Sequence, residues 1–157
     1  MFKFKIMRLE IIQGVILLGM LSLMLGQANA EIEYVSIAEN AAVMYEEPSL
    51  QSKKLYVASI HLPVEAVITV AGWVKVRDRS GGLAWVENKF LSERRFVIVT
   101  VPLANVYEIA DENSVQVFQA QEDIVMERLD SDVPGWIKVR HRDGQLGYIK
   151  VSEVWGA

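Results

Sequence analysis

The chain has 157 residues, a formal net charge of −4 and no cysteine. The missing cysteine excludes disulfides, a thiol nucleophile, a lipid-modified amino-terminal cysteine and any cysteine-based metal site. The acidic balance disfavours nucleic acid as a partner, because phosphate backbones carry charge of the same sign.

The amino terminus has the three parts of a secretory signal peptide. Basic side chains occur within the first eight residues, a mainly apolar run extends from Ile11 to Leu25, and Ala28 and Ala30 give small-x-small spacing. We therefore predict a signal peptide at residues 1–30 that is cleaved after Ala30. An uncleaved anchor and, more remotely, a buried core helix are the alternatives, but the run is shorter than the roughly 20 residues that a membrane span needs.

Residues 31–157 contain 13 basic and 19 acidic side chains, a net charge of −6. Their number allows one ordinary domain or two very small ones. Short apolar runs alternate with turn residues, which is typical of strands spaced along a small barrel. In the first half, strands are expected within 31–38, 41–45, 54–60, 64–72 and the hairpin at 72–86.

The second half repeats the first. Residues 135–149 (GWIKVRHRDGQLGYI) are identical to residues 72–86 (GWVKVRDRSGGLAWV) at eight of 15 positions, at an offset of 63. Tyr45 and Tyr107 correspond at an offset of 62, which one insertion or deletion explains. The charged junction at 87–95 lacks glycine and proline. It is predicted to form a short turn or helical kink that leaves the two halves in contact. The strands expected before the second hairpin lie within 96–102, 103–107, 115–120 and 124–135.

Each hairpin alternates aliphatic residues on one side with aromatic and cationic residues on the other, the period of a strand. A three-residue loop ending in glycine places Ile137 opposite Ile149 and Val139 opposite Gly147, all on one side. A two-residue Asp-Gly turn is the alternative in the second copy, but it would place Ile149 opposite Lys138 and break the aliphatic side. We therefore predict three-residue loops in both copies.

The other side of each hairpin provides the candidate ligand-binding residues. The register places Lys75 opposite Trp85 and Lys138 opposite Tyr148, where an exposed cation–π contact contributes about 0.5–1 kcal/mol. Alternatively, the tryptophans that open the hairpins pack beneath the early loop and seal the barrel. The candidates are Trp73, Lys75, Trp85, Trp136, Lys138, Tyr148, Tyr45 and Tyr107.

No constellation of residues indicates catalysis, a cofactor or a metal site. The two histidines, His61 and His141, occupy unrelated places in the repeat, and His141 is predicted to be solvated at the hairpin edge. Glu127, Asp130 and Asp132 lack the surrounding calcium loop and are predicted to form a solvated turn. No serine lies in a Gly-x-Ser-x-Gly context. We therefore expect that the protein is not an enzyme.

The second hairpin resembles the last hairpin of bacterial SH3-like (Src-homology-3-like) domains, which opens with Gly-Trp and closes with Gly, an aromatic and an aliphatic residue. The LSERR junction and the final VWGA are similar to a tandem proteobacterial version of this family. The resemblance extends over about residues 33–157. The family's early-loop Arg and Gly-Pro are represented here by Tyr45 and Pro48 alone, and by Tyr107 and Ala110 in the second copy.

The resemblance implies an all-β fold of two tandem small SH3-like β-barrels after the signal peptide, at residues 31–92 and 93–157. Relatives are accessory modules of exported proteins, and some bind peptidoglycan peptides. We expect a periplasmic or secreted, non-catalytic module that binds peptidoglycan or a peptide of the cell envelope, without nucleic acid or, after cleavage, membrane as a partner. The alternative is a structural adaptor that contacts another envelope protein through the barrel surfaces. The oligomeric state is left open.

Overall fold

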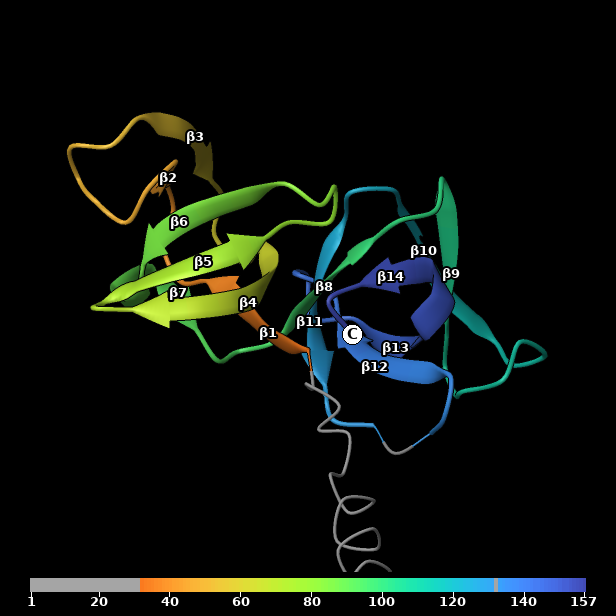
Figure 1. The fold of residues 1–157 in the computed structure, drawn as a ribbon. Helices are drawn as coiled ribbons and strands as arrows, with labels where there is room; N and C mark the ends of the chain where they lie inside the picture. The colour runs from red at the N-terminus through yellow and green to blue at the C-terminus, as the bar shows by residue number, and fades with distance from the viewer. Residues whose placement is uncertain (1–31, 132) are drawn as a thin grey trace, which may run out of the picture. The chain divides into compact units, whose positions relative to one another are not determined.

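The computed structural model describes residues 32–131 and 133–157, and the predicted signal peptide at residues 1–30 lies outside them. Residues Ile32–Ala157 form one compact unit that contains two antiparallel seven-stranded sheets, one from each half (Figure 1). The strands of the first sheet are β1 (Glu33–Ile37), β2 (Ala42–Tyr45), β3 (Lys54–Ala58), β4 (Pro63–Val70), β5 (Trp73–Arg77), β6 (Leu83–Glu87) and β7 (Leu91–Ser92). The strands of the second sheet are β8 (Phe96–Val99), β9 (Leu103–Tyr107), β10 (Gln116–Gln121), β11 (Val125–Leu129), β12 (Trp136–Arg140), β13 (Leu146–Lys150) and β14 (Val154–Trp155).

The two sheets have the same topology. The order is β3-β2-β6-β5-β4-β1-β7 in the first and β10-β9-β13-β12-β11-β8-β14 in the second, so each strand has a counterpart seven places later. Each sheet curls into a small barrel around its own core. The predicted all-β fold of two tandem barrels is confirmed. The junction after β6 contains a 3₁₀ turn, η2 (Asn88–Phe90), and η3 (Val151–Glu153) is its counterpart after β13. This agrees with the predicted short turn or helical kink.

The hairpin register is the predicted one. Ile137 pairs with Ile149 and Val139 with Gly147 across β12 and β13, and the equivalent pairs form across β5 and β6. The Gly144 amide donates to the His141 carbonyl at 2.9 Å, and Gly144 has a φ of 93°. A residue with a Cβ is strained at that angle, so glycine closes the three-residue loop.

The aliphatic sides of the hairpins face the two cores. In the first barrel, Met44 and Val64 are fully buried, and their counterparts in the second barrel are Val106 and Met126. The same two positions thus carry one methionine and one valine in opposite order, which keeps the volume of the core. The first core contains Ile37, Ala42, Met44, Ala58, Val64, Val74, Val76, Ala84 and Val86. The second contains Val97, Val99, Ala104, Val106, Ala120, Met126, Ile137, Val139, Ile149 and Val154.

The change of offset between the copies has two structural sources. In the first barrel, Ala66 pairs with Val76 and Ile68 with Lys75, so the strand β4 has one extra, bulged residue at Val67. In the second barrel, β11 has no such bulge and ends at Leu129, and the connection to β12 is longer. The expected single insertion or deletion is therefore the net result of two opposite changes.

Candidate functional site

Three of the four predicted candidates of the first barrel lie in a continuous row across the sheet. Tyr45 on β2 pairs with Trp85 on β6, Trp85 pairs with Lys75 on β5, and Lys75 pairs with Ile68 on β4. The Lys75 ammonium lies 5.8 Å from the centre of the Trp85 ring. Ile68 is 49% exposed, so the apolar end of the row is open to solvent.

The second barrel repeats this row with the same chemical types. Tyr107 on β9 pairs with Tyr148 on β13, which pairs with Lys138 on β12, and Lys138 pairs with Leu129 on β11. The Lys138 ammonium lies 5.9 Å from the centre of the Tyr148 ring. Both barrels therefore contain tyrosine, a second aromatic ring, lysine and an aliphatic residue in the same order across the sheet. We refer to each set as the aromatic row.

The tryptophan that opens each hairpin packs edge-on against the tyrosine of its row. The ring centres are 5.4 Å apart for Tyr45 and Trp73, and 5.7 Å apart for Tyr107 and Trp136. Tyr45 is buried, whereas Tyr107 and both tryptophans are partly exposed. The T-shaped contact fixes the orientation of each tryptophan and leaves part of its ring open to solvent. That these eight residues bind a ligand stays a prediction.

The surroundings of the two tryptophans differ in charge. Trp73 pairs across the hairpin with Glu87, whereas Trp136 pairs with Lys150. Lys150 forms a 2.8 Å ion pair with Glu112, and a hydrogen bond to that carboxylate raises the pKa of Lys150. The loop that carries Glu112 and the Trp136 ring line an open hollow of about 470 Å³. The second row therefore adjoins an open hollow whose lining includes Glu112, one partner of this ion pair.

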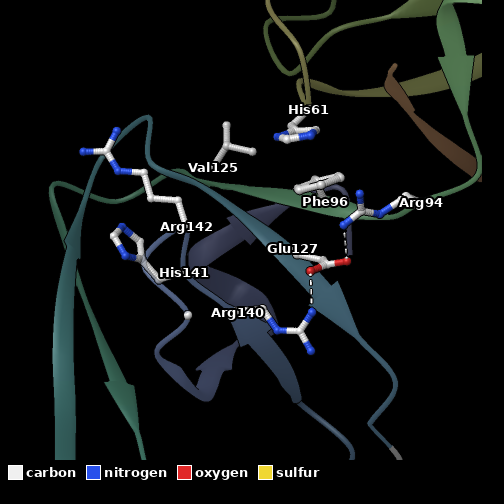
Figure 2. A pocket seen from close by; sticks show the side chains of 9 residues that line it. His61, Arg94, Phe96, Val125, Glu127, Arg140, His141 and Arg142 are labelled. Carbon is white, nitrogen blue, oxygen red and sulfur yellow. Dashed lines mark hydrogen bonds and ion pairs between the residues drawn. The ribbon is translucent and has the colours of Figure 1, made fainter. Parts of the chain in front are cut away.

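A second candidate site, which the sequence analysis did not predict, lies where the two barrels meet. A pocket of about 270 Å³ is lined by residues of both halves (Figure 2). His61 comes from the turn between β3 and β4 of the first barrel, and Arg94 comes from the junction. We refer to this cavity as the junction pocket. Its lining residues are His61, Arg94, Phe96, Val125, Glu127, Arg140, His141, Arg142 and Gly144.

Glu127 forms two ion pairs in the junction pocket. Its Oε1 accepts from Arg94 Nη2 at 2.7 Å, and its Oε2 accepts from Arg140 Nη1 at 3.0 Å. The hydrogen bond from Arg94 is the main reason why the pKa of Glu127 is lowered from 4.5. The prediction of a solvated turn at this residue is wrong, because Glu127 belongs to the strand β11 and faces Arg140 across the ladder.

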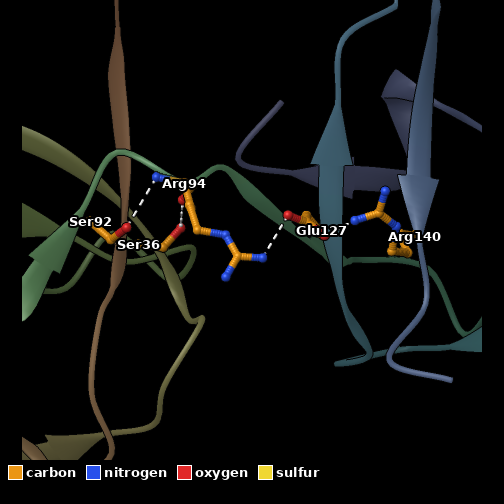
Figure 3. Close-up of polar contacts among 5 residues, drawn as sticks. All are labelled: Ser36, Ser92, Arg94, Glu127 and Arg140. Carbon is orange, nitrogen blue, oxygen red and sulfur yellow. Dashed lines mark hydrogen bonds and ion pairs between the residues drawn. The ribbon is translucent and has the colours of Figure 1, made fainter. Parts of the chain in front are cut away.

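The backbone of Arg94 is held by the first barrel while its side chain reaches the second (Figure 3). The buried Ser36 hydroxyl donates to the Arg94 carbonyl at 2.8 Å, and the Arg94 amide donates to Ser92 Oγ at 3.1 Å. The side chain then binds Glu127. The predicted contact between the halves is thus present, and it fixes one wall of the junction pocket.

Both histidines line this pocket, although they occupy positions that are not equivalent in the repeat. The His61 ring stacks on Phe96 with centres 4.2 Å apart. His141, predicted to be solvated, is only 22% exposed and its Nδ1 lies 2.9 Å from Asp143. The sequence signal that could have revealed the pocket is the excess of basic residues in the second hairpin loop and at the junction of an otherwise acidic chain.

Two further properties concern the described residues only. Within residues 32–131 and 133–157, no group of three or more His, Asp or Glu side chains could hold a metal ion. In the same part of the chain, no helix has the length and hydropathy required to cross a bilayer.

Comparison with known proteins identifies the repeated unit. The bacterial SH3 domain family matches residues 38–93 and again residues 100–156. Two solved structures, NlpC2 and NlpC1 from Trichomonas vaginalis, are similar at 17% and 16% sequence identity, each with a TM-score of 0.38. The matches cover 82% of this chain and 49% and 47% of those chains, so this chain spans about half their length. The comparison with curated proteins gives no match. Because the family match falls once on each sheet and covers most of the chain, the protein belongs to the bacterial SH3 domain family and carries two copies of the domain in tandem.

Proposed function

We propose that this protein is a non-catalytic module of the cell envelope that binds peptidoglycan, or a peptide exposed there, through its two aromatic rows. The observation that carries the proposal is the repetition of the row in both barrels. Tyrosine, aromatic ring, lysine and aliphatic residue occur in the same order across the same strands. Core packing alone does not require lysine over an aromatic ring on the outer side of both hairpins.

The chemistry of the row suits a peptide or sugar ligand. A partly exposed aromatic ring stacks on a sugar face or an apolar side chain, and the adjacent ammonium pairs with a carboxylate. Each row offers only a few side chains to a ligand, so one site alone is expected to bind weakly. Two sites on one chain raise the overall affinity when the ligand is repetitive, because the second contact is intramolecular. Peptidoglycan is such a ligand.

The signal peptide expected at residues 1–30 supports a periplasmic or secreted location, where peptidoglycan is accessible. The absence of cysteine supports a binding role rather than thiol catalysis. The family match to a bacterial SH3 domain on each of the two sheets gives the chain two similar surfaces that can act together.

The test is co-sedimentation of purified mature protein, residues 31–157, with isolated sacculi. We expect a substantial fraction in the pellet at low salt, and less at high salt because the lysine contacts are screened. Protein that stays wholly in the supernatant at low salt contradicts the proposal. An unrelated acidic protein of similar size serves as the control for trapping in the pellet.

A structural adaptor role is the alternative, and one feature favours it. Strand β3 lies at the end of the first sheet and exposes three consecutive large residues: Leu55, Tyr56 and Val57 are 38%, 39% and 59% exposed. An apolar edge strand can accept a strand of a partner protein. This alternative predicts capture of an envelope protein without binding to sacculi. A Val57→Lys variant would abolish such capture and leave sedimentation with sacculi unchanged.

A further inference from the structure

The junction between the barrels is built from equivalent elements of the two copies, but they carry different residues. His61 and Asp123 occupy equivalent positions in corresponding turns of the two barrels. Their φ angles are 69° and 71°, and their amides donate to the carbonyl of the last residue of the first strand in each barrel, Ile37 and Val99 respectively. Arg79 and Arg142 are likewise equivalent, because each is the first residue of the three-residue loop in its hairpin.

One half of the junction is closed by ion pairs. Arg79, in the hairpin loop of the first barrel, pairs with Asp123 in the turn of the second, and with the neighbouring Glu122 at 3.6 Å. In the other half, the hairpin loop of the second barrel carries Arg142 and the turn of the first barrel carries His61. His61 therefore occupies the position that corresponds to Asp123 in the part of the junction that is closed by ion pairs.

The result is a cavity with excess positive charge. Within residues 32–131 and 133–157, no carboxylate forms an ion pair with Arg142. Glu127 does not neutralise it, since both of its oxygens are bound by Arg94 and Arg140. Asp143, on the same loop as Arg142, accepts from the Gln145 amide and lies beside His141.

Three arginines and one carboxylate leave the junction pocket with a charge of +2 when both histidines are neutral. This positive charge is localised in a chain whose net charge is negative. Figure 2 shows Glu127 between Arg94 and Arg140 on one side of the cavity, and Arg142 on the other side with its side chain extending away from them. The His61–Phe96 stack and Val125 supply an apolar wall.

We propose that the junction pocket binds the carboxylate of a small ligand, a peptide carboxyl terminus in particular, with Arg142 in the role that Arg79 has toward Asp123. The ligand replaces the carboxylate that His61 does not provide. Guanidinium groups bind carboxylates in two parallel hydrogen bonds, and the apolar wall accommodates a small side chain next to the carboxylate. A cavity of about 270 Å³ admits one or two small residues and not a folded partner.

This proposal is independent of the aromatic rows. Of the residues that line the junction pocket, none belongs to an aromatic row or to the eight predicted candidates. Failure of sacculus binding would therefore leave the carboxylate site untouched, and the reverse also holds.

The experiment is a titration of isotope-labelled mature protein with acetyl-Ala-Ala, which has a free carboxylate, and with the matched acetyl-Ala-Ala amide. We expect shifts of the His61, Arg142 and Gly144 amide resonances with the acid and not with the amide. Inorganic phosphate is the third probe. Tighter binding of phosphate than of the peptide acid would overturn the assignment to a carboxylate, and so would equal binding of acid and amide.

The variants His61→Asp and His61→Asn separate charge from shape. Both side chains tolerate the positive φ at this position, as Asp123 does in the equivalent turn. Both lose the stacking on Phe96, so their difference isolates the carboxylate. H61D adds a carboxylate to the lining of the positively charged pocket and is expected to weaken peptide binding about ten-fold or more relative to H61N. Equal affinity of the two variants would overturn the proposal.

Arg142→Ala tests the proposed contact directly. Loss of a hydrogen-bonded charge pair is expected to weaken binding at least about ten-fold, whereas the control Lys89→Ala, on the surface near η2, leaves it unchanged. Folding of each variant is checked by its unfolding midpoint. An R142A protein that folds and binds the peptide as tightly as the wild type contradicts the proposal.

Discussion

Arg79 pairs with Asp123 across the junction, a contact between the hairpin loop of one copy and a turn of the other. The equivalent loop and turn in the opposite copies carry Arg142 and His61, which cannot form that pair. The same backbone elements thus meet in both parts of the junction, but only the part with Asp123 is closed by an ion pair between the barrels.

The closed half should contribute measurably, but modestly, to stability. Arg79→Ala is expected to lower the free energy of unfolding by about 0.5 kcal/mol, because both side chains of the pair are partly exposed to solvent. A double-mutant cycle with Asp123→Ala measures the coupling by chemical denaturation. The same cycle on Arg142 and His61 is expected to give no coupling. Coupling of equal size in both halves would contradict the asymmetry.

Gly147 should not accept a larger side chain. A Cβ there would lie 2.5 Å from Val106 Cγ1 and 2.7 Å from the Tyr107 carbonyl oxygen. Gly147→Ala is therefore expected to cost about 1–3 kcal/mol of unfolding free energy. The equivalent residue of the first barrel is already Ala84, where the unbranched Met44 takes the place of Val106. Leu146→Ala, at an exposed position, is the control, and an equal loss of stability in both variants would refute the steric argument.

The ion pairs of Glu127 should appear in the pH dependence of stability. Its pKa is lowered in the folded protein, chiefly by the hydrogen bond from Arg94. The stabilisation is therefore fully present above the ordinary value of 4.5 and is lost as the pH falls through the folded pKa. Glu127→Gln should be less stable than the wild type near neutral pH, with the difference vanishing in acid. A difference that does not change with pH would argue against the ion pairs.

Glu153 should behave in the opposite way. Burial raises its pKa above 4.5, and one carboxylate oxygen is buried without a hydrogen-bond partner. A raised pKa favours the folded state below the unfolded value, and that contribution is lost as the pH rises through the folded pKa. Glu153→Gln is thus expected to be more stable than the wild type at neutral pH and equal to it in acid. Thermal unfolding at several pH values distinguishes this from a loss of stability at every pH.

The hairpins could be predicted from the sequence because their period and loop length determine the register. A slip of one residue would have placed Ile149 opposite Lys138 and broken the aliphatic side, so one register was preferred. The bulge at Val67 could not be predicted, since a single extra residue in β4 is compensated by a longer connection after Leu129.

The junction pocket was missed for a different reason. His61 and His141 are not equivalent in the repeat, and only the contact between the barrels brings them to one cavity. Periodicity describes each strand and its neighbours, whereas this site depends on how one barrel's turn meets the other barrel's hairpin loop. Glu127 was misjudged because it was assigned to the turn before Pro134 although it lies in the strand β11, and because one of its partners, Arg94, lies in the junction.

The central functional claim concerns the aromatic rows, and sedimentation with sacculi of row variants tests it most directly. Trp85→Ala and Tyr148→Ala each remove the ring beneath one lysine. With unfolding midpoints confirming that each protein is folded, either single variant is expected to be retained less than the wild type, and the double variant to remain in the supernatant. A folded double variant that pellets with sacculi as completely as the wild type would contradict the claim.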